Sequence, residues 1–380
     1  MRVLLGLVAF AVVPALTPAP GPSTPAATPV GSVVVRAGGD RDPATGDPQP
    51  VAGARIGVVG VVGVEPGGTG EPGDPITPAG ACTTGADGTC SVAGLAPGPY
   101  RVVPLDDPPG SALHRITTIE PAGDGPVPYG VVVTVTDGAT AAATLAYRRA
   151  NPAPATGCGA RVTLVHDLSG SIAPDEAAAM TRATLGFVDT LAGSAVRLGI
   201  ASFATAAPAA GNTDHAPTPL ADPAGVADVR AAVLALVRPG GTDRYTNWDA
   251  ALRAAVGEQD LVVLLTDGNP TVHGVPAVHP PVVTGREQIE AAVASAGAVK
   301  AAGARIVAVG VGDPAQQSPT NLALVSGPVV GVDHFVATVA GLAEVWRTLA
   351  AAICTPGPDP DPEPEPEPEP DPVPAPRFTG

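Results

Sequence analysis

Between residues 156 and 354, short apolar runs alternate with alanine-rich segments of helical length, and this alternation constrains the fold more than any other feature. Each run is a nearly continuous series of branched side chains, which is typical of strands buried on both faces of a parallel sheet. We therefore predict a doubly wound α/β domain, with ligands at the carboxyl ends of its strands. The expected strands are RVTLVH, VRLGIASF, DLVVLLT, ARIVAVGV and DHFVA, and the expected helices span 175–192, 224–237, 247–257, 286–301 and 338–352.

Residues 31–150 have a different pattern and predict a separate all-β domain. Short Val-rich runs are separated by Gly, Pro and Asp, without a helical period: SVVVRA, ARIGVV, YRVVP, GVVVTV and ATLAY. Several short strands with turn signals between them indicate a small antiparallel β-sandwich. The strongest local signal is TTGADGTCSVAGLAPGPYRVV, where Asp87 and Gly88 predict a tight turn.

The two ends of the chain do not have the composition of a folded core. Residues 1–27 begin MRVLLGLVAFAVVPAL, an apolar run shorter than the roughly 20 residues of a membrane span, and continue with Pro, Thr and Ala. They predict an export signal and a flexible lead, with an uncleaved anchor as the alternative. Residues 355–380 are mostly Pro, Asp and Glu, which predicts an extended acidic linker or tail.

The charge balance of the chain disfavours polyanionic partners. Asp and Glu number 36 against 20 Lys and Arg, a formal net charge of −16, and Lys300 is the single lysine. Nucleic acids and anionic lipid surfaces are bound through basic side chains. We therefore expect no nucleic-acid partner, and membrane contact only through the signal or anchor. An acidic chain is better suited to binding a divalent cation.

A cluster of oxygen-bearing side chains is expected where two of the predicted strands end. Asp167 follows RVTLVH and Asp267 follows DLVVLLT, so both carboxylates reach one edge of the sheet. Ser169 and Ser171 alternate with Asp167 in DLSGS, and Thr246 precedes an expected helix. Oxygen-only ligands favour hard cations, with Mg²⁺ expected first and Mn²⁺ or Ca²⁺ as alternatives. Taken alone, DLSGS could instead be an Asx turn that caps the next helix.

Together these positions resemble the metal-ion-dependent adhesion site of von Willebrand factor type A (VWA) domains. In that family an Asp-x-Ser-x-Ser loop, a Thr on a second loop and an Asp on a third hold one divalent cation. The matching residues here are Asp167, Ser169, Ser171, Thr246 and Asp267. The resemblance covers residues 156–354 and implies a Rossmann-like α/β fold. It also implies a cation with an open coordination position, which an Asp or Glu of a protein partner can fill.

Two details of this resemblance stay open. Thr242 follows two glycines and is the alternative to Thr246, which we prefer because Asn247 and the Ala-Leu pair at 251–252 continue the family pattern. His166 stands where the family usually has an apolar residue. The resemblance also implies that the domain's ends lie together, so Cys158 and Cys354 are expected to form a disulfide.

Residues 31–150, chiefly through the stretch 83–103, resemble the B-type, prealbumin-like (SpaA-type) modules of Gram-positive surface proteins. Such modules often carry a Lys–Asn isopeptide crosslink, which is impossible here because residues 31–150 contain neither Lys nor Asn. Cys82 and Cys90 flank the turn at 85–88, and we expect a disulfide across a hairpin, with two buried thiols as the alternative. Cysteines of an exported chain are disulfide candidates in general. The module itself is expected to be a spacer.

We therefore expect a non-enzymatic adhesion protein, secreted or on the cell surface, that binds an extracellular-matrix or other host or cell-surface protein. The final PRFTG is faintly similar to a sortase signal in Thr379 and Gly380, so wall anchoring and a plain linker end both stay open. The alternatives are a scaffold for complex assembly and a hydrolase that uses Asp167 or Ser169.

Residues near the predicted metal loops could contact the partner: Asp243, Arg244, Tyr245, His273 and His279. Trp248 could join them or pack under its helix.

Overall fold

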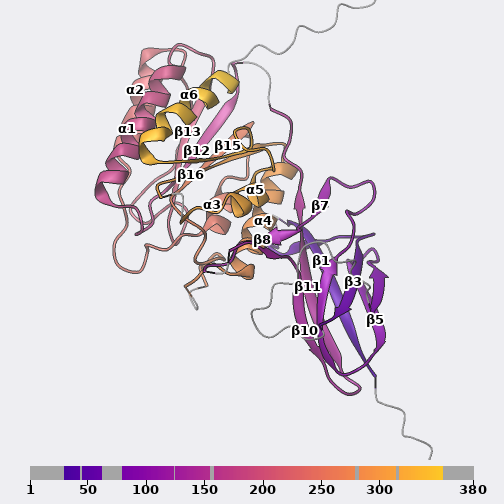
Figure 1. Ribbon diagram of the computed structural model, residues 1–380. Coiled ribbons are helices and arrows are strands. Elements are labelled where there is room, and N and C mark those ends of the chain that lie inside the picture. Colours follow the sequence, from indigo (N-terminus) through magenta and orange to yellow (C-terminus); the bar gives the residue numbers. More distant parts are fainter. Residues whose placement is uncertain are drawn as a thin grey trace, which may run out of the picture.

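The computed structural model describes residues 30–42, 45–61, 79–123, 125–154, 158–278, 282–313 and 316–353. An all-β unit is followed by an α/β unit (Figure 1). The strands of the all-β unit are β1 (Gly31–Arg41), β2 (Pro48–Pro50), β3 (Arg55–Gly60), β4 (Gly80–Thr83), β5 (Thr89–Leu95), β6 (Gly98–Pro104), β7 (Leu113–Arg115), β8 (Thr118–Ile119), β9 (Val127–Pro128), β10 (Val131–Val135) and β11 (Thr140–Arg149). Among these described residues, no helix is both long and apolar enough to span a membrane.

The all-β unit consists mainly of two sheets that share one core. One has the order β2-β1-β11-β7 with β5 also paired to β1, and the other has the order β10-β6-β3-β4. Fully buried Val33, Val58 and Leu145 belong to the same core cluster. The expectation of purely antiparallel pairing is wrong, because β1 and β11 pair in parallel. They are the first and last strands of the unit, and the long chain between them allows the crossover that parallel pairing requires.

Cys82 and Cys90 form the expected disulfide, but not across a hairpin. Cys82 lies on β4, which pairs with β3, whereas Cys90 lies on β5, which pairs with β1. The bond therefore joins the two sheets. The predicted turn between the cysteines is present, with Gly88 in the left-handed region at φ 72°.

Replacing Cys82 and Cys90 together by serine should lower the free energy of unfolding by about 2–3 kcal/mol, because a cross-link of this short loop restricts the unfolded chain. Denaturant unfolding of the double variant and its parent measures the difference. Intact-mass analysis after alkylation without reductant should leave both cysteines of the parent unlabelled. Labelling of both residues in the folded parent would contradict the bond.

The α/β unit contains one six-stranded sheet covered by helices on both faces. Its elements are β12 (Arg161–Asp167), α1 (Pro174–Leu191), β13 (Arg197–Phe203), β14 (His215–Pro219), α2 (Pro223–Leu234), α3 (Trp248–Ala254), β15 (Leu261–Thr266), α4 (Arg286–Ala301), β16 (Arg305–Val311), α5 (Pro319–Val325), β17 (His334–Ala337), a 3₁₀ turn η2 (Val339–Gly341) and α6 (Leu342–Ile353). Helices α1, α2 and α6 share one core with the sheet, and α3, α4 and α5 share another. The strand order is β14-β13-β12-β15-β16-β17, and β14 is antiparallel.

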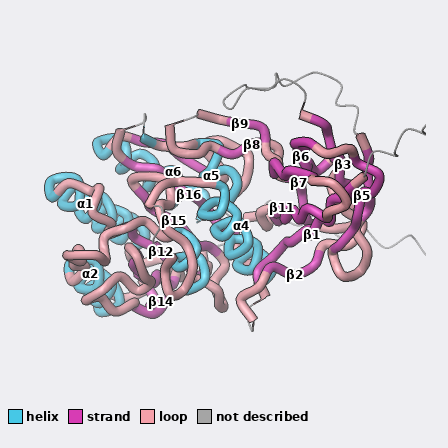
Figure 2. Tube along the Cα trace, turned by 90° about the horizontal axis from the view of Figure 1, so that it is seen from below, coloured by secondary structure: helices cyan, strands magenta, loops and turns pink. Residues whose placement is uncertain are grey.

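Helix α4 belongs to both units. It lies between the α/β sheet and strands β1 and β11 (Figure 2). Its buried residues occur on all sides and are mostly small, among them Ala292, Ala296 and Gly297. A Cβ on Gly297 would lie 2.5 Å from Oδ1 of Asp40 on β1, so glycine is needed for this close approach. In the second half of β1, consecutive residues are buried, because the sheet core and α4 cover opposite faces of the strand.

Lys300 lies in the last turn of α4, at the junction of the two units. Its side chain is 4% exposed, and Nζ donates a hydrogen bond to the carbonyl oxygen of Arg149 at 3.1 Å. Burial, assisted by Arg148, lowers the pKa of Lys300 to about 7, although Asp333 and Asp40 oppose this shift. The folded protein therefore holds this amine less strongly protonated than the unfolded chain does.

The pKa of Lys300 predicts that stability rises with pH. Between the folded pKa of about 7 and the ordinary value of 10.5, the unfolded chain binds more protons, so the free energy of unfolding should increase over this window. Lys300→Met should remove most of this increase, which is a few kcal/mol. Urea unfolding of parent and variant near neutral pH and near pH ~9.5 measures it. If the free energy of unfolding changed equally with pH in the two proteins, the lowered pKa of Lys300 would be contradicted.

Candidate metal centre

The predicted cluster lies where the strand order of the α/β sheet reverses. β12 pairs in parallel with β13 on one side and with β15 on the other. The helices that follow β12 and β15 leave toward opposite faces of the sheet, and loops that diverge in this way leave a crevice for ligands. Asp167 is the last residue of β12, and Asp267 directly follows Thr266, the last residue of β15.

Hydrogen bonds join four of the five predicted metal ligands. Asp167 is fully buried, and its Oδ1 accepts a hydrogen bond from the backbone N–H of Ser169 at 2.8 Å. The hydroxyl oxygens of Ser169 and Ser171 are 3.0 Å apart. The Ser169 hydroxyl also donates to Oδ1 of Asp267 at 3.4 Å. These contacts connect the loop after β12 to the loop after β15.

The fifth predicted ligand, Thr246, lines the same crevice as Ser171 and Asp267. It is 5% exposed, and its backbone N–H donates to the hydroxyl of Thr271 at 3.1 Å. Thr246, Ser171 and Asp267 line one cavity. The alternative, Thr242, is exposed and is not among the residues that line the cavity.

This cavity has a volume of about 470 Å³, and both units form its walls. The α/β unit supplies mainly hydroxyl and amide side chains, together with Asp267. The all-β unit supplies the segment that follows β8, held to the α/β unit by a hydrogen bond of 3.0 Å from the backbone N–H of Ala122 to the carbonyl oxygen of Thr284. The described lining residues are Glu120, Pro121, Ala122, Gly123, Gly125, Ser171, Thr246, Asp267, Gly268, Asn269, Thr271, Thr284, Gln316 and Gln317.

The electrostatics of the centre suit a hard divalent cation. Burial and the nearby Asp267 carboxylate raise the pKa of Asp167. Burial and Glu176 raise the pKa of Asp267, although hydrogen bonds from Ser171 and Ser169 oppose the shift. Two carboxylates therefore lie in surroundings that disfavour their ionised forms, and a bound cation reverses this preference. The donors are all oxygen atoms, which fits Mg²⁺, Mn²⁺ or Ca²⁺.

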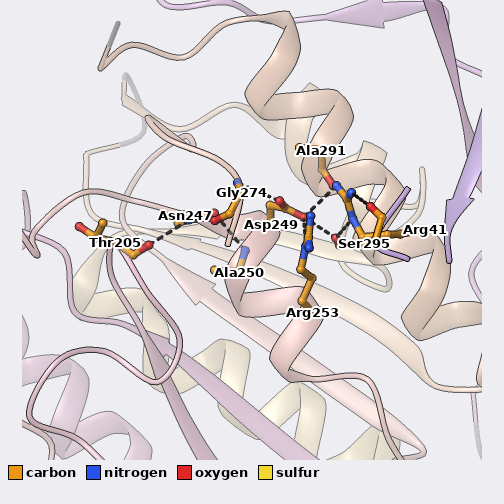
Figure 3. Close-up of polar contacts among 10 residues, drawn as sticks. Arg41, Thr205, Asn247, Asp249, Ala250, Arg253, Gly274, Ala291 and Ser295 are labelled. Carbon is orange, nitrogen blue, oxygen red and sulfur yellow. Dashed lines mark hydrogen bonds and ion pairs between the residues drawn. The ribbon is translucent and has the colours of Figure 1, made fainter. Parts of the chain in front are cut away.

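Asn247 fixes the loop that carries Thr246. Its Oδ1 caps α3 by accepting from the backbone N–H of Ala250 at 3.0 Å. Its Nδ2 donates to the carbonyl oxygens of Thr205 at 2.9 Å and Gly274 at 3.0 Å (Figure 3). Asn247 is fully buried, and these bonds satisfy both ends of its side chain. The residue that follows Thr246 therefore connects three separate segments of the chain.

Several residues of the centre were not predicted from the sequence. The hydroxyl of Thr266 donates to Oδ2 of Asp167 at 2.8 Å and so orients the carboxylate from the neighbouring strand. Thr266 lies immediately before Asp267 at the end of a buried strand, and this position could have identified it as a residue of the site from the sequence. Gln317 donates to the backbone carbonyl of Asp267. Glu120 comes from the other unit, and no local pattern points to it.

The residues expected to contact a partner do not lie together on one surface. Arg244 is exposed. It lies beside the loop that follows β12, because its carbonyl oxygen accepts a hydrogen bond from the backbone N–H of Gly170 at 2.7 Å. Asp243 and Tyr245 flank it and are partly buried. His273 is not among the described residues that line the cavity beside Asp267, and instead lines a second cavity between β1 and α4. His279 lies outside the described residues.

Two further sequence-based expectations concern Trp248 and the domain ends. Trp248 is 1% exposed and packs in the core, so it does not belong to a contact surface. Cys158 lies before β12, but Cys354 is outside the described residues, so their disulfide stays a prediction.

No family model matches the sequence, and no curated protein matches it. Solved structures are similar to part of the chain at low sequence identity. Proximal thread matrix protein 1 from the mussel byssus is 17% identical, with a TM-score of 0.39, over 53% of this chain and 50% of that one. The pilus adhesin SpaC from Lactobacillus rhamnosus GG, in its open conformation, is 16% identical, with a TM-score of 0.40, over 55% and 31%. The vWF domain of the type V pili tip protein Mfa5 from Porphyromonas gingivalis is 16% identical, with a TM-score of 0.39, over 52% and 96%.

The aligned part of this chain corresponds to half or less of the length of the mussel protein and of SpaC. At TM-scores this low, none of these similarities establishes a relationship. The evidence for a doubly wound α/β unit is its own strand order and helix placement.

Proposed function

We propose that the chain is a VWA-type binding protein, exported to the cell surface or beyond, whose α/β unit holds a divalent cation. The ligands are Asp167, Ser169, Ser171, Thr246 and Asp267, and Mg²⁺ is the expected ion. One observation carries the proposal: Ser171, Thr246 and Asp267, from three separate loops, line a single cavity at the point where strand order reverses. Hydrogen bonds join Ser169 and Asp167 to this group. When bound, the cation offers an open coordination position to the carboxylate of a protein partner.

The residues of the chain support binding rather than turnover. Hydroxyl ligands leave a bound divalent ion with much of its positive charge, so it attracts a partner carboxylate. Thr266 keeps Asp167 oriented. The cavity that the partner enters is lined largely by uncharged residues such as Thr271 and Gln316, with Glu120 beside them. Ser169 hydrogen-bonds a hydroxyl and a carboxylate, so its described side-chain bonds do not include an imidazole that could act as a base.

The remainder of the chain fits an exposed adhesin. Both ends of the chain lie outside the described residues, and their composition alone supports this part of the proposal. The first residues predict an export signal, and the Pro, Asp and Glu of residues 355–380 predict an acidic spacer that would hold the folded units away from a surface. The partner is a matrix, host or cell-surface protein that presents an Asp or Glu. The B-type, Gram-positive character of the all-β unit belongs to the same proposal.

A capture experiment tests this function. Protein immobilised through its N-terminal end is incubated with matrix or host extract in Mg²⁺ or in chelator, beside a Thr246→Val variant that removes one hydroxyl ligand. We expect a partner that is retained by the parent in Mg²⁺ and released by chelator, and weakly retained by the variant. Equal retention under all three conditions would remove the cation from the function. Turnover of a substrate panel that is lost in Ser169→Ala would favour the hydrolase instead.

A further inference from the structure

The all-β unit touches the α/β unit at two places from which hydrogen bonds lead to the metal loops. One contact starts at Arg41, the last residue of β1, and the other at Glu120, directly after β8. Both lead to side chains within three residues of a predicted metal ligand. The all-β unit therefore contacts the loops of the cation site, which a simple spacer would not do.

The first contact is an ion pair inside the junction. Nη2 of Arg41 donates to Oδ1 of Asp249 at 3.1 Å, and Nε of Arg41 donates to the hydroxyl of Ser295 at 2.9 Å (Figure 3). The carbonyl oxygen of Ala291 accepts a further bond from Arg41 at 3.2 Å. Asp249 is 1% exposed and lies in the first turn of α3, three residues after Thr246. A carboxylate this deeply buried depends on its partners.

Asp249 extends this contact to the metal threonine. Its Oδ2 accepts a hydrogen bond from the backbone N–H of Gly274 at 2.9 Å, and the carbonyl oxygen of Gly274 accepts from Asn247 at 3.0 Å. The loop that contains Gly274 also contacts Thr246 directly, because the backbone N–H of Thr271 donates a hydrogen bond to the carbonyl oxygen of Thr246 at 2.8 Å. A ring of bonds therefore connects Asp249 to the backbone of the metal ligand.

The second contact leads to the other side of the cavity. The side chain of Asn321 binds the backbone of Glu120 in both directions, accepting at 3.0 Å and donating at 2.9 Å. Its Nδ2 also donates to Oδ1 of Asn269 at 3.1 Å, and Asn269 is two residues after Asp267. The hydroxyl of Ser318 donates to the Glu120 carboxylate at 2.5 Å. Asn321 is fully buried, so these partners satisfy it away from water.

We propose that the all-β unit completes the cation site and that the site depends on docking of the two units. Arg41, acting through Asp249, holds the loop that carries Thr246. Glu120, acting through Asn321, holds the loop that carries Asp267, and its segment forms a wall of the cavity. These are positioning residues and not metal ligands. The inference rests on the proposed cation and assigns the all-β unit a part in binding it.

The test measures Mn²⁺ binding to the full chain by calorimetry, with the electron paramagnetic resonance signal of free Mn²⁺ as a second readout. Arg41→Met breaks the first contact, and Arg41→Lys keeps its charge. Asn321→Ala breaks the second contact independently. The matched control is Arg149→Met, which removes an arginine of the same unit whose 2.8 Å bond to Asp40 leads to no metal loop. Thermal melting of each variant is recorded beside the binding curve.

We expect Arg41→Met and Asn321→Ala each to raise the Kd for Mn²⁺ about tenfold, as is usual for loss of a group that orients metal ligands. Arg41→Lys should recover much of the loss, and Arg149→Met should bind like the parent. If Arg41→Met and Asn321→Ala melt earlier yet bind Mn²⁺ as the control does, the contacts are merely structural and the inference is overturned. If Arg41→Met does not fold, the Asn321→Ala result decides. If the parent binds no Mn²⁺, the proposed function itself is overturned. Failure of the proposed function can therefore be told apart from failure of the docking inference.

Discussion

Asp167→Ala is expected to abolish cation binding while the protein stays folded. Asp167 accepts hydrogen bonds from Ser169 at 2.8 Å and from Thr266 at 2.8 Å, so its loss removes a carboxylate and also frees the loop that carries the two serines. We expect the affinity for Mn²⁺ to fall by at least about 100-fold, the upper range for disrupted metal-site neighbours. Calorimetric titration of parent and variant with Mn²⁺ and Mg²⁺ measures the loss.

The fold should survive this substitution. Burial raises the pKa of Asp167, so the folded apo protein does not gain stability from the ionised carboxylate. Asp243→Ala is the matched control, because it removes the same charge from the loop beside Thr246 without removing a proposed ligand. Circular dichroism should show native spectra for both variants. An Asp167→Ala protein that binds Mn²⁺ as tightly as Asp243→Ala does would exclude this metal centre.

Trp248→Ala should cause the largest loss of stability, about 3–5 kcal/mol, because it leaves a cavity in a packed core. The Trp248 side chain is 1% exposed, in the core cluster that also contains Leu252 and Leu264. Its Nε1 donates to the hydroxyl of Thr266 at 3.2 Å, and this hydroxyl in turn donates to Asp167. The substitution therefore weakens the core and the support of the metal centre together. Denaturant unfolding at equilibrium measures the change.

Trp248→Phe separates the two effects. Phenylalanine restores most of the buried ring but cannot donate to Thr266, so the stability loss should be smaller than for alanine while Mn²⁺ affinity still falls. A change in unfolding free energy below about 1 kcal/mol for Trp248→Ala would show that the indole is not packed as described.

The α/β unit was largely predictable because its signals are local. Continuous apolar runs predicted five of its six strands, and the rule that ligands gather at strand ends predicted that Asp167 and Asp267 lie at one edge of the sheet. β14 was missed because HAPTP contains two prolines, and α5 because seven residues are too short for a clear helical period. These elements form through contacts with neighbouring parts of the fold rather than through their own preferences.

The relation between the units could not be predicted from local patterns. The parallel pairing of β1 with β11 joins strands about a hundred residues apart. The bonds of Arg41 to Asp249 and of Glu120 to Asn321 span longer separations. Each residue taken alone is an ordinary charged or amide side chain near a turn or strand end. Only the docking of α4 on β1 and β11 brings these residues into contact, which is why the all-β unit was expected to be a spacer.

Because α4 packs against both units, it affects how the chain can fold during its synthesis. Ribosomes add about 5–20 residues per second, so the chain from the end of β11 to the end of α4 takes roughly 8–30 s to make. During that time a nascent all-β unit would present an apolar face whose natural cover has not yet been translated. Such a face is a docking point for chaperones and for unwanted neighbours. The timing favours holding the chain unfolded until α4 has emerged, whether at the ribosome or beyond an export channel.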